Sequence, residues 1–153
     1  MALRAFENGR VVSFLYDSKS GQVVQRFPIE NGSVNAISNN GNVAGQGSFS
    51  TLGWFVVGGV AGTVPFPGGT GSGAPGINNR GDVAGFINLP EGFFGSSHAV
   101  VYSSRTGALN DLGTLGGTSS IAFAINERGQ ATGWANLPGP LFGAPQHAFR
   151  SNG

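Results

Sequence analysis

The sequence predicts an all-β fold of tandem four-stranded antiparallel repeats, propeller-like, from its glycine content, its apolar content and a motif that occurs three times. Of the 153 residues, 28 are glycine. Each glycine inside a helix would cost about 1 kcal/mol relative to alanine, so long helices are excluded. Apolar residues make up 39% of the chain and the net charge is only +1, which excludes disorder of the weakly apolar, highly charged kind. With long helices and disorder excluded, we expect one turn-rich β domain.

A ten-residue motif defines the repeat. It reads AISNNGNVAG at 36–45, GINNRGDVAG at 76–85 and AINERGQATG at 124–133. Its isoleucines are 40 and 48 residues apart, a period typical of four-stranded units. Asparagine and glycine adopt positive φ at little steric cost, so each copy predicts a hairpin between the third and fourth strands of a unit.

The first two strands of each unit precede this motif. Val11–Tyr16 leads to a turn that ends at Gly21, and residues 98–102 lead to a turn that ends at Gly107. Both copies place tyrosine five residues before glycine, and residues 54–57 are the weaker counterpart in the middle copy. The spacing therefore predicts twelve strands in three units, at about residues 10–53, 54–97 and 98–146.

Both ends of the chain extend beyond these units. Residues 5–9 (AFENG) resemble residues 148–153 (AFRSNG), where a fourth copy of the His-Ala strand begins. We expect terminal strands at about 3–6 and 147–150, which either complete another unit's sheet, within the chain or across a subunit boundary, or belong to a longer array. Unpaired strand edges attract further strands, so the sequence predicts a homo-oligomer.

The most specific motifs lie in the third unit and directly after it: HAVVY at 98–102, DLGTLGG at 111–117, AINERGQ at 124–130 and HAF at 147–149. These resemble the bacterial extracellular repeats named HAF after their His-Ala-Phe motif. The resemblance is close over 98–149 and looser over about 34–97, where the middle unit lacks the His-Ala and Asp-Leu-Gly-Thr-Leu segments. It implies a propeller-like tandem β-repeat in surface or secreted proteins, and it supplies no catalytic residues.

The blades of a propeller must close into a ring. Rings usually hold four to eight blades, and three would leave too tight a centre. The repeats therefore favour either a ring shared by two or more chains or an open, prism-like packing of the sheets.

Charge and hydropathy narrow the classes of partner. The eight Lys and Arg are spread singly along the chain, so no basic stripe is expected for a nucleic acid. No apolar run approaches the roughly 18 residues of a membrane span, and the first residues do not form the apolar stretch of a signal peptide. Low charge with abundant Gly, Ser and Asn favours an extracellular or cell-surface location.

Two histidines, His98 and His147, occupy equivalent positions just ahead of a repeat strand. They could contact a ligand or a metal, but a divalent site normally needs three or four ligands and neither has a second ligand at close spacing. The alternative is that each histidine hydrogen-bonds a neighbouring backbone carbonyl. We expect this structural role, with no metal and no cofactor.

Carboxylates are scarce, and their positions suit turns and strand edges. Asp82 and Glu127 lie within two residues of a turn glycine, and Asp111 begins a strand segment. A glycosidase would need two carboxylates about 5–10 Å apart, and no Gly-x-Ser-x-Gly elbow occurs. A hydrolase acting on a polysaccharide or an ester is therefore the second hypothesis, and no catalytic residue is assigned.

A duplicated loop is the best candidate for binding. NLPEGFFG at 88–95 and NLPGPLFG at 136–143 match at five of eight positions and join one unit to the next. Loops on a rigid β frame carry binding residues, and aromatic rings beside amides suit a sugar or an apolar protein surface. The alternative is that the loop phenylalanines fill the edge of the core. The candidate ligand-binding residues are Asn88, Phe93, Phe94, Trp134, Asn136, Phe142, His98 and His147.

The sequence thus favours a non-enzymatic extracellular or surface-type module that self-associates and can bind a glycan or a protein through these loops. Repetition of weak sites would supply avidity. A purely structural repeat fragment without a ligand is the third hypothesis.

Overall fold

The computed structural model describes residues 2–27, 32–47, 52–90, 96–140 and 143–153. Over these residues the chain is all-β, with fourteen strands and no helix, so the all-β prediction is confirmed. The strands are β1 (Ala2–Glu7), β2 (Arg10–Asp17), β3 (Gln22–Arg26), β4 (Ser33–Ile37), β5 (Val43–Gln46), β6 (Gly53–Val57), β7 (Val60–Thr63), β8 (Gly71–Ile77), β9 (Asp82–Asn88), β10 (Ser97–Ser103), β11 (Leu109–Gly113), β12 (Ser120–Ile125), β13 (Ala131–Asn136) and β14 (Gln146–Arg150).

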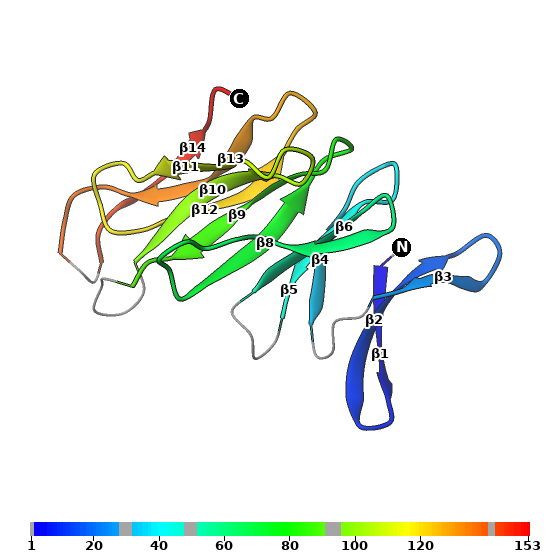
Figure 1. Cartoon of the computed structure of the whole chain (residues 1–153). Coiled ribbons are helices and arrows are strands. Elements are labelled where there is room, and N and C mark those ends of the chain that lie inside the picture. Colours follow the sequence, from blue (N-terminus) through cyan, green and yellow to red (C-terminus); the bar gives the residue numbers. More distant parts are fainter. Residues whose placement is uncertain (1, 28–31, 48–51, 91–95, 141–142) are drawn as a thin grey trace.

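The strands form four antiparallel sheets, which follow one another across the molecule from the N-terminal to the C-terminal end (Figure 1). Sheet A contains β1–β3, sheet B β4–β7, sheet C β8–β11 and sheet D β12–β14. Within each sheet every strand pairs with the next strand in the chain. The architecture is thus a series of three- and four-stranded meanders.

The sheets are offset from the units predicted by the repeat. Each of sheets B, C and D begins with the strand that precedes the hairpin motif, so β4 and β5 pair with β6 and β7 and not with β2 and β3. The units 10–53, 54–97 and 98–146 therefore do not coincide with hydrogen-bonded sheets. A repeat of four strands has the same period wherever it is cut, so its spacing does not reveal where a sheet begins.

The predicted hairpins are present in sheets B, C and D. The strand pairs β4–β5, β8–β9 and β12–β13 are joined by the Asn-rich turns, with Ile37 opposite Val43 and Ile77 opposite Val83 in the first two. The fourth residue of these turns is Gly41, Gly81 and Gly129, with φ of 88°, 81° and 82°. Residues with a side chain rarely adopt this backbone conformation. These glycines are therefore required by the turn.

A second series of glycines accommodates a β-bulge. The first strand of sheets B, C and D shifts register after its second or third residue pair. A backbone carbonyl at the bulge lies directly over a glycine of the second strand, where a Cβ atom would overlap with it. The pairs are Gly45 with Ser33, Gly85 with Gly73 and Gly133 with Ile121.

The core lies between successive sheets, because alternate residues of each strand face opposite neighbours. In sheet B, Val43 and Trp54 pack toward Leu15 of sheet A, whereas Ala44 and Phe55 pack toward sheet C. The C/D interface is built from four fully buried alanines, which let the two sheets approach closely. These are Ala84, Ala99, Ala122 and Ala131.

Candidate functional site

The two Asn-Leu-Pro connections lie at the ends of the sheets opposite the hairpins. Asn88 and Asn136 are the last residues of β9 and β13. Their backbone carbonyls accept equivalent hydrogen bonds from the amides of Thr70 (2.9 Å) and Gly117 (3.0 Å). These two asparagines therefore anchor the strand ends through their backbones, and the Oδ1 atom of Asn136 is buried without a hydrogen-bond partner among the described residues.

Each connection is closed by a further backbone hydrogen bond of 2.9 Å, from Leu89 to Ser96 in the first and from Leu137 to Pro145 in the second. The loop aromatics predicted to bind a ligand, Phe93, Phe94 and Phe142, lie outside the described residues. Their role stays a prediction.

Among the described residues, His98 contacts a carboxylate and not the backbone carbonyl expected for this position. Its Nδ1 atom lies 2.8 and 3.1 Å from the two carboxylate oxygens of Asp111 on the neighbouring strand β11. Asp111 Oδ1 also accepts the amide of Gly113 at 2.7 Å. His147 occupies the equivalent place on β14 and is exposed. The described part of sheet D has no counterpart of β11, so His147 has no equivalent carboxylate beside it.

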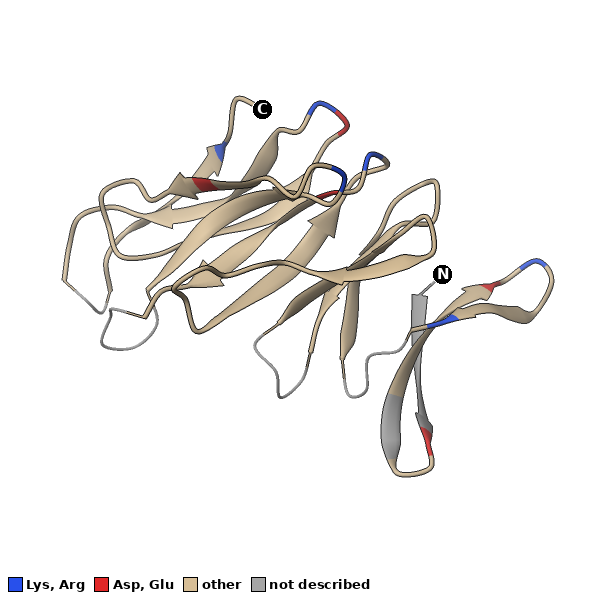
Figure 2. Ribbon diagram, viewed as in Figure 1, with Lys and Arg blue, Asp and Glu red and all other residues tan. Residues whose placement is uncertain are grey.

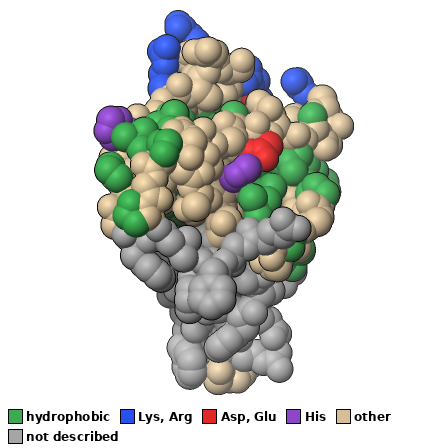
Figure 3. Space-filling view, turned by 90° about the vertical axis from the view of Figure 1, so that its left-hand side faces the viewer, with side chains coloured by type: hydrophobic (Ala, Val, Ile, Leu, Met, Phe, Trp, Pro, Cys, Tyr) green, Lys and Arg blue, Asp and Glu red, His purple; other side chains and the backbone are tan. Residues whose placement is uncertain are grey.

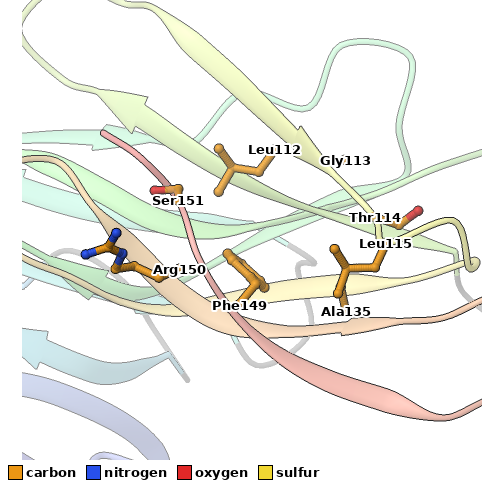
Figure 4. Close-up of a pocket in the computed structure, with 8 residues that line it drawn as sticks. All are labelled: Leu112, Gly113, Thr114, Leu115, Ala135, Phe149, Arg150 and Ser151. Carbon is orange, nitrogen blue, oxygen red and sulfur yellow. The ribbon is translucent and has the colours of Figure 1, made fainter.

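Figure 3 shows the histidines on one face of the molecule, one of them beside an acidic side chain, with hydrophobic side chains around them. A hollow of about 180 Å³ lies between β11 and β14. In Figure 4, Leu112, Leu115 and Phe149 converge on this hollow, and Arg150 and Ser151 lie at one end. Its walls are therefore mainly apolar.

Two carboxylates, Asp17 and Asp82, accept hydrogen bonds within their own turns. Asp17 accepts the Ser20 hydroxyl at 2.7 Å, a hydrogen bond that lowers the pKa of Asp17. Burial raises the pKa of Asp82, but hydrogen bonds from Asn78 and Arg80 outweigh burial and hold the pKa below its ordinary value. A general acid needs a raised pKa, so these two groups suit structural roles.

The three hairpin turns form a continuous polar row, which we call the turn ladder. Asn42 Nδ2 donates to the carbonyls of Asn78 (3.2 Å) and Asn79 (3.1 Å) in the next turn. Asn78 Nδ2 donates to the carbonyl of Asn126 (3.0 Å) in the third turn, and the Asn79 amide donates to Glu127 Oε1 (3.1 Å). Side chains of each motif copy thus bind the backbone of the next turn, although the donors Asn42 and Asn78 hold different motif positions. This role cannot be read from one turn alone, because its partners lie in the next repeat.

Two equivalent grooves lie beside the turn ladder. The B/C groove has a volume of about 290 Å³ and is lined by Phe55, Val57, Val60, Arg80, Ser104 and Arg105. The C/D groove has a volume of about 360 Å³, and its polar lining includes Arg80, Asp82, Asn110, Arg128, Ser151 and Asn152. Arg80 borders both grooves, and Arg128 occupies the same motif position one repeat later.

The outer face of sheet D, directed away from sheet C, is exposed. Phe123 of β12 is 50% exposed, and Ala124 and Thr132 are also exposed. A hollow of about 190 Å³ lies next to the last hairpin on this face, lined by Ala124, Ile125, Asn126, Gln130, Thr132 and Arg150.

Comparisons with family models, with curated proteins and with solved structures found no match. The described residues contain no helix with the length and apolar character of a membrane span. They also contain no cluster of three or more His, Cys, Asp or Glu side chains that could hold a metal ion.

Proposed function

We propose that this chain is a non-enzymatic β-repeat module, propeller-like in the stacking of its sheets, that self-associates when a second copy covers the outer face of sheet D. The resemblance to HAF-type repeats and the low charge support this class of protein and an extracellular or cell-surface location. The observation that carries the proposal is a pair of facing motif positions that is covered in sheet C and open in sheet D.

One pair of facing positions shows the difference. Gly76 and Ala84 of sheet C are buried, and a Cβ on Gly76 would meet the backbone of Phe123 in sheet D at 2.8 Å. Ala44 is the counterpart of Ala84 in sheet B and is also fully buried. The counterparts of Gly76 and Ala84 in sheet D are Ala124 and Thr132, which are both exposed.

The turn ladder is also incomplete on this face. The Nδ2 atom of Asn78 donates twice, to Asp82 in its own turn and to the carbonyl of Asn126 in the following turn. Within the part of the chain that the structure describes, the Nδ2 atom of Asn126 donates only inside its own turn, to Gln130 Oε1 at 2.9 Å. The hollow of about 190 Å³ lies beside these side chains, at the place where a following hairpin would pack.

A second copy is the occupant that fits best, because Ala124 and Thr132 hold the motif positions that Gly76 and Ala84 use at the C/D interface within the chain. Small residues at the covered positions let one β-sheet lie against another. A head-to-tail contact of this kind generates a ring if the rotation closes, and a filament if it does not.

The experiment is measurement of molar mass in solution by light scattering and sedimentation over a wide range of concentration. We expect a wild-type oligomer, and we expect Thr132→Lys to shift it toward the monomer because a charge would be buried without a partner. Val24→Lys is the matched control, since Val24 is 60% exposed on β3. A wild-type monomer at every concentration would overturn the proposal, as would equal effects of the two substitutions.

A further inference from the structure

Three arginines gather at the hairpin end of sheets B to D. Arg80 and Arg128 are the third residues of successive hairpin turns, and Arg105 lies in the turn between β10 and β11. Figure 2 shows basic residues at these turns, and Figure 3 shows basic side chains at the same end of the molecule. We call Arg105, Arg80 and Arg128 the arginine row.

Two members of the row are available to a ligand. Arg80 is held by Asp82, with Nε and Nη2 2.9 and 2.7 Å from Oδ2. Arg105 and Arg128 are exposed, and neither forms an ion pair within the described part of the chain. Their guanidinium groups can therefore bind carboxylate or sulfate groups in the bidentate geometry that arginine favours.

The two grooves beside the arginines add partly apolar surface to these charges. The B/C groove places Phe55 and Val57 beside Ser104, and the C/D groove places Val101 and Leu112 beside polar side chains. An apolar wall with a few convergent polar groups is typical of small-ligand sites. Such a site suits a sugar ring, which has apolar C–H faces and hydroxyl groups around its edge.

We propose that the arginine row and its two grooves bind an acidic polysaccharide, which crosses successive sheets and places carboxylate or sulfate groups on Arg105 and Arg128. Asp82 already pairs with Arg80, so the row offers two unpaired cations among the described residues, beside groove walls that are partly apolar. A nucleic acid carries a phosphate at every nucleotide and is bound through a run of Lys and Arg. Two separate cations beside apolar surface therefore favour an acidic glycan over a nucleic acid.

This site does not need self-association to bind a short oligomer. It lies at the opposite end of the sheets from the Asn-Leu-Pro loops, and its residues are not those of the outer face of sheet D. Repetition along the stack would add weak contacts to one polymer chain, so affinity should grow with polymer length.

The test is calorimetric or biosensor titration with polygalacturonate oligomers, with neutral dextran and single-stranded DNA as comparison probes. We expect wild-type protein to bind polygalacturonate and not dextran, more weakly at high salt because the contacts are exposed ion pairs. The double variant Arg105→Gln/Arg128→Gln should weaken binding by about tenfold or more, since two charge-assisted contacts are lost.

The control is Lys19→Gln/Arg26→Gln, which removes the same charge from sheet A and should leave the affinity unchanged. Three results would overturn the proposal: no preference for polygalacturonate over dextran, equal losses in the two double variants, or tighter binding of single-stranded DNA. A monomer that still binds polygalacturonate would refute self-association while supporting this site.

Discussion

Gly85→Ala tests whether the β-bulge requires glycine in the strand opposite. A Cβ atom on Gly85 would overlap with the carbonyl of Gly73 and lie 3.5 Å from the Cα atom of Ala74. Both neighbours are backbone atoms of β8, so no side chain can rotate away. The bulge must open, or β8 must move away from β9.

The size of the effect follows from the pairing that would be disturbed. Strands β8 and β9 pair at five positions, which lie on both sides of the bulge. Loss of two or three backbone hydrogen bonds, each worth about 1 kcal/mol, lowers the free energy of unfolding by about 2–3 kcal/mol. In a protein of this length 1 kcal/mol corresponds to about 2–4 °C, so Tm should fall by roughly 4–12 °C.

Thermal unfolding followed by circular dichroism measures this difference against Gly107→Asn. Gly107 also has a positive φ, 73°, but no atom lies within 4 Å of a Cβ built there. Asparagine tolerates this conformation, so the control should lose no more than about 2–4 °C. Equal Tm values for the two variants would refute the claim that the bulge carbonyl excludes a side chain.

Two further changes probe the hairpin and the C/D interface. Asp82 has a lowered pKa relative to its ordinary 3.8, so its stabilising contribution is present above about pH 4 and is lost as pH falls through the folded-state value. Urea unfolding should therefore show wild type and Asp82→Asn converging in stability with acidification, and parallel profiles would contradict this. Ala84→Leu overfills the alanine interface between sheets C and D and should cost about 1–3 kcal/mol. Ala61→Leu on exposed β7 should be nearly neutral, and similar losses in both variants would count against close sheet packing.

The repeat motif was sufficient to predict the β class and the hairpins, because these depend on residues close in the sequence. Gly41, Gly81 and Gly129 determine local turn geometry, which the spacing of asparagine and glycine reveals directly. The starting strand of each sheet could not be predicted in this way. It depends on which strands pair in space, and the contacts between sheets are equally distant in the sequence, since Asn42 bonds Asn78, 36 residues further along the chain.

The contacts at the candidate sites are of the same long-range kind. His98 and Asp111 are 13 residues apart and meet only because β10 and β11 pair. Arg80 and Arg128 were each interpreted as an isolated surface charge, and their alignment follows from the stacking of sheet D on sheet C. The alignment of the two arginines could have been predicted from their shared motif position, since residues at one motif position occupy equivalent places on neighbouring sheets.

The same stacking connects the two proposals in physical terms. A second copy that covered Ala124 and Thr132 in the manner of the C/D interface would place its own turns next to Arg128. The arginine row would then extend from one copy to the next, and a polymer would contact more arginines without any single contact becoming stronger. Polysaccharide length dependence should therefore be steeper for wild type than for Thr132→Lys, although both bind short oligomers equally. Identical length dependence in the two proteins would show that glycan binding and self-association are uncoupled.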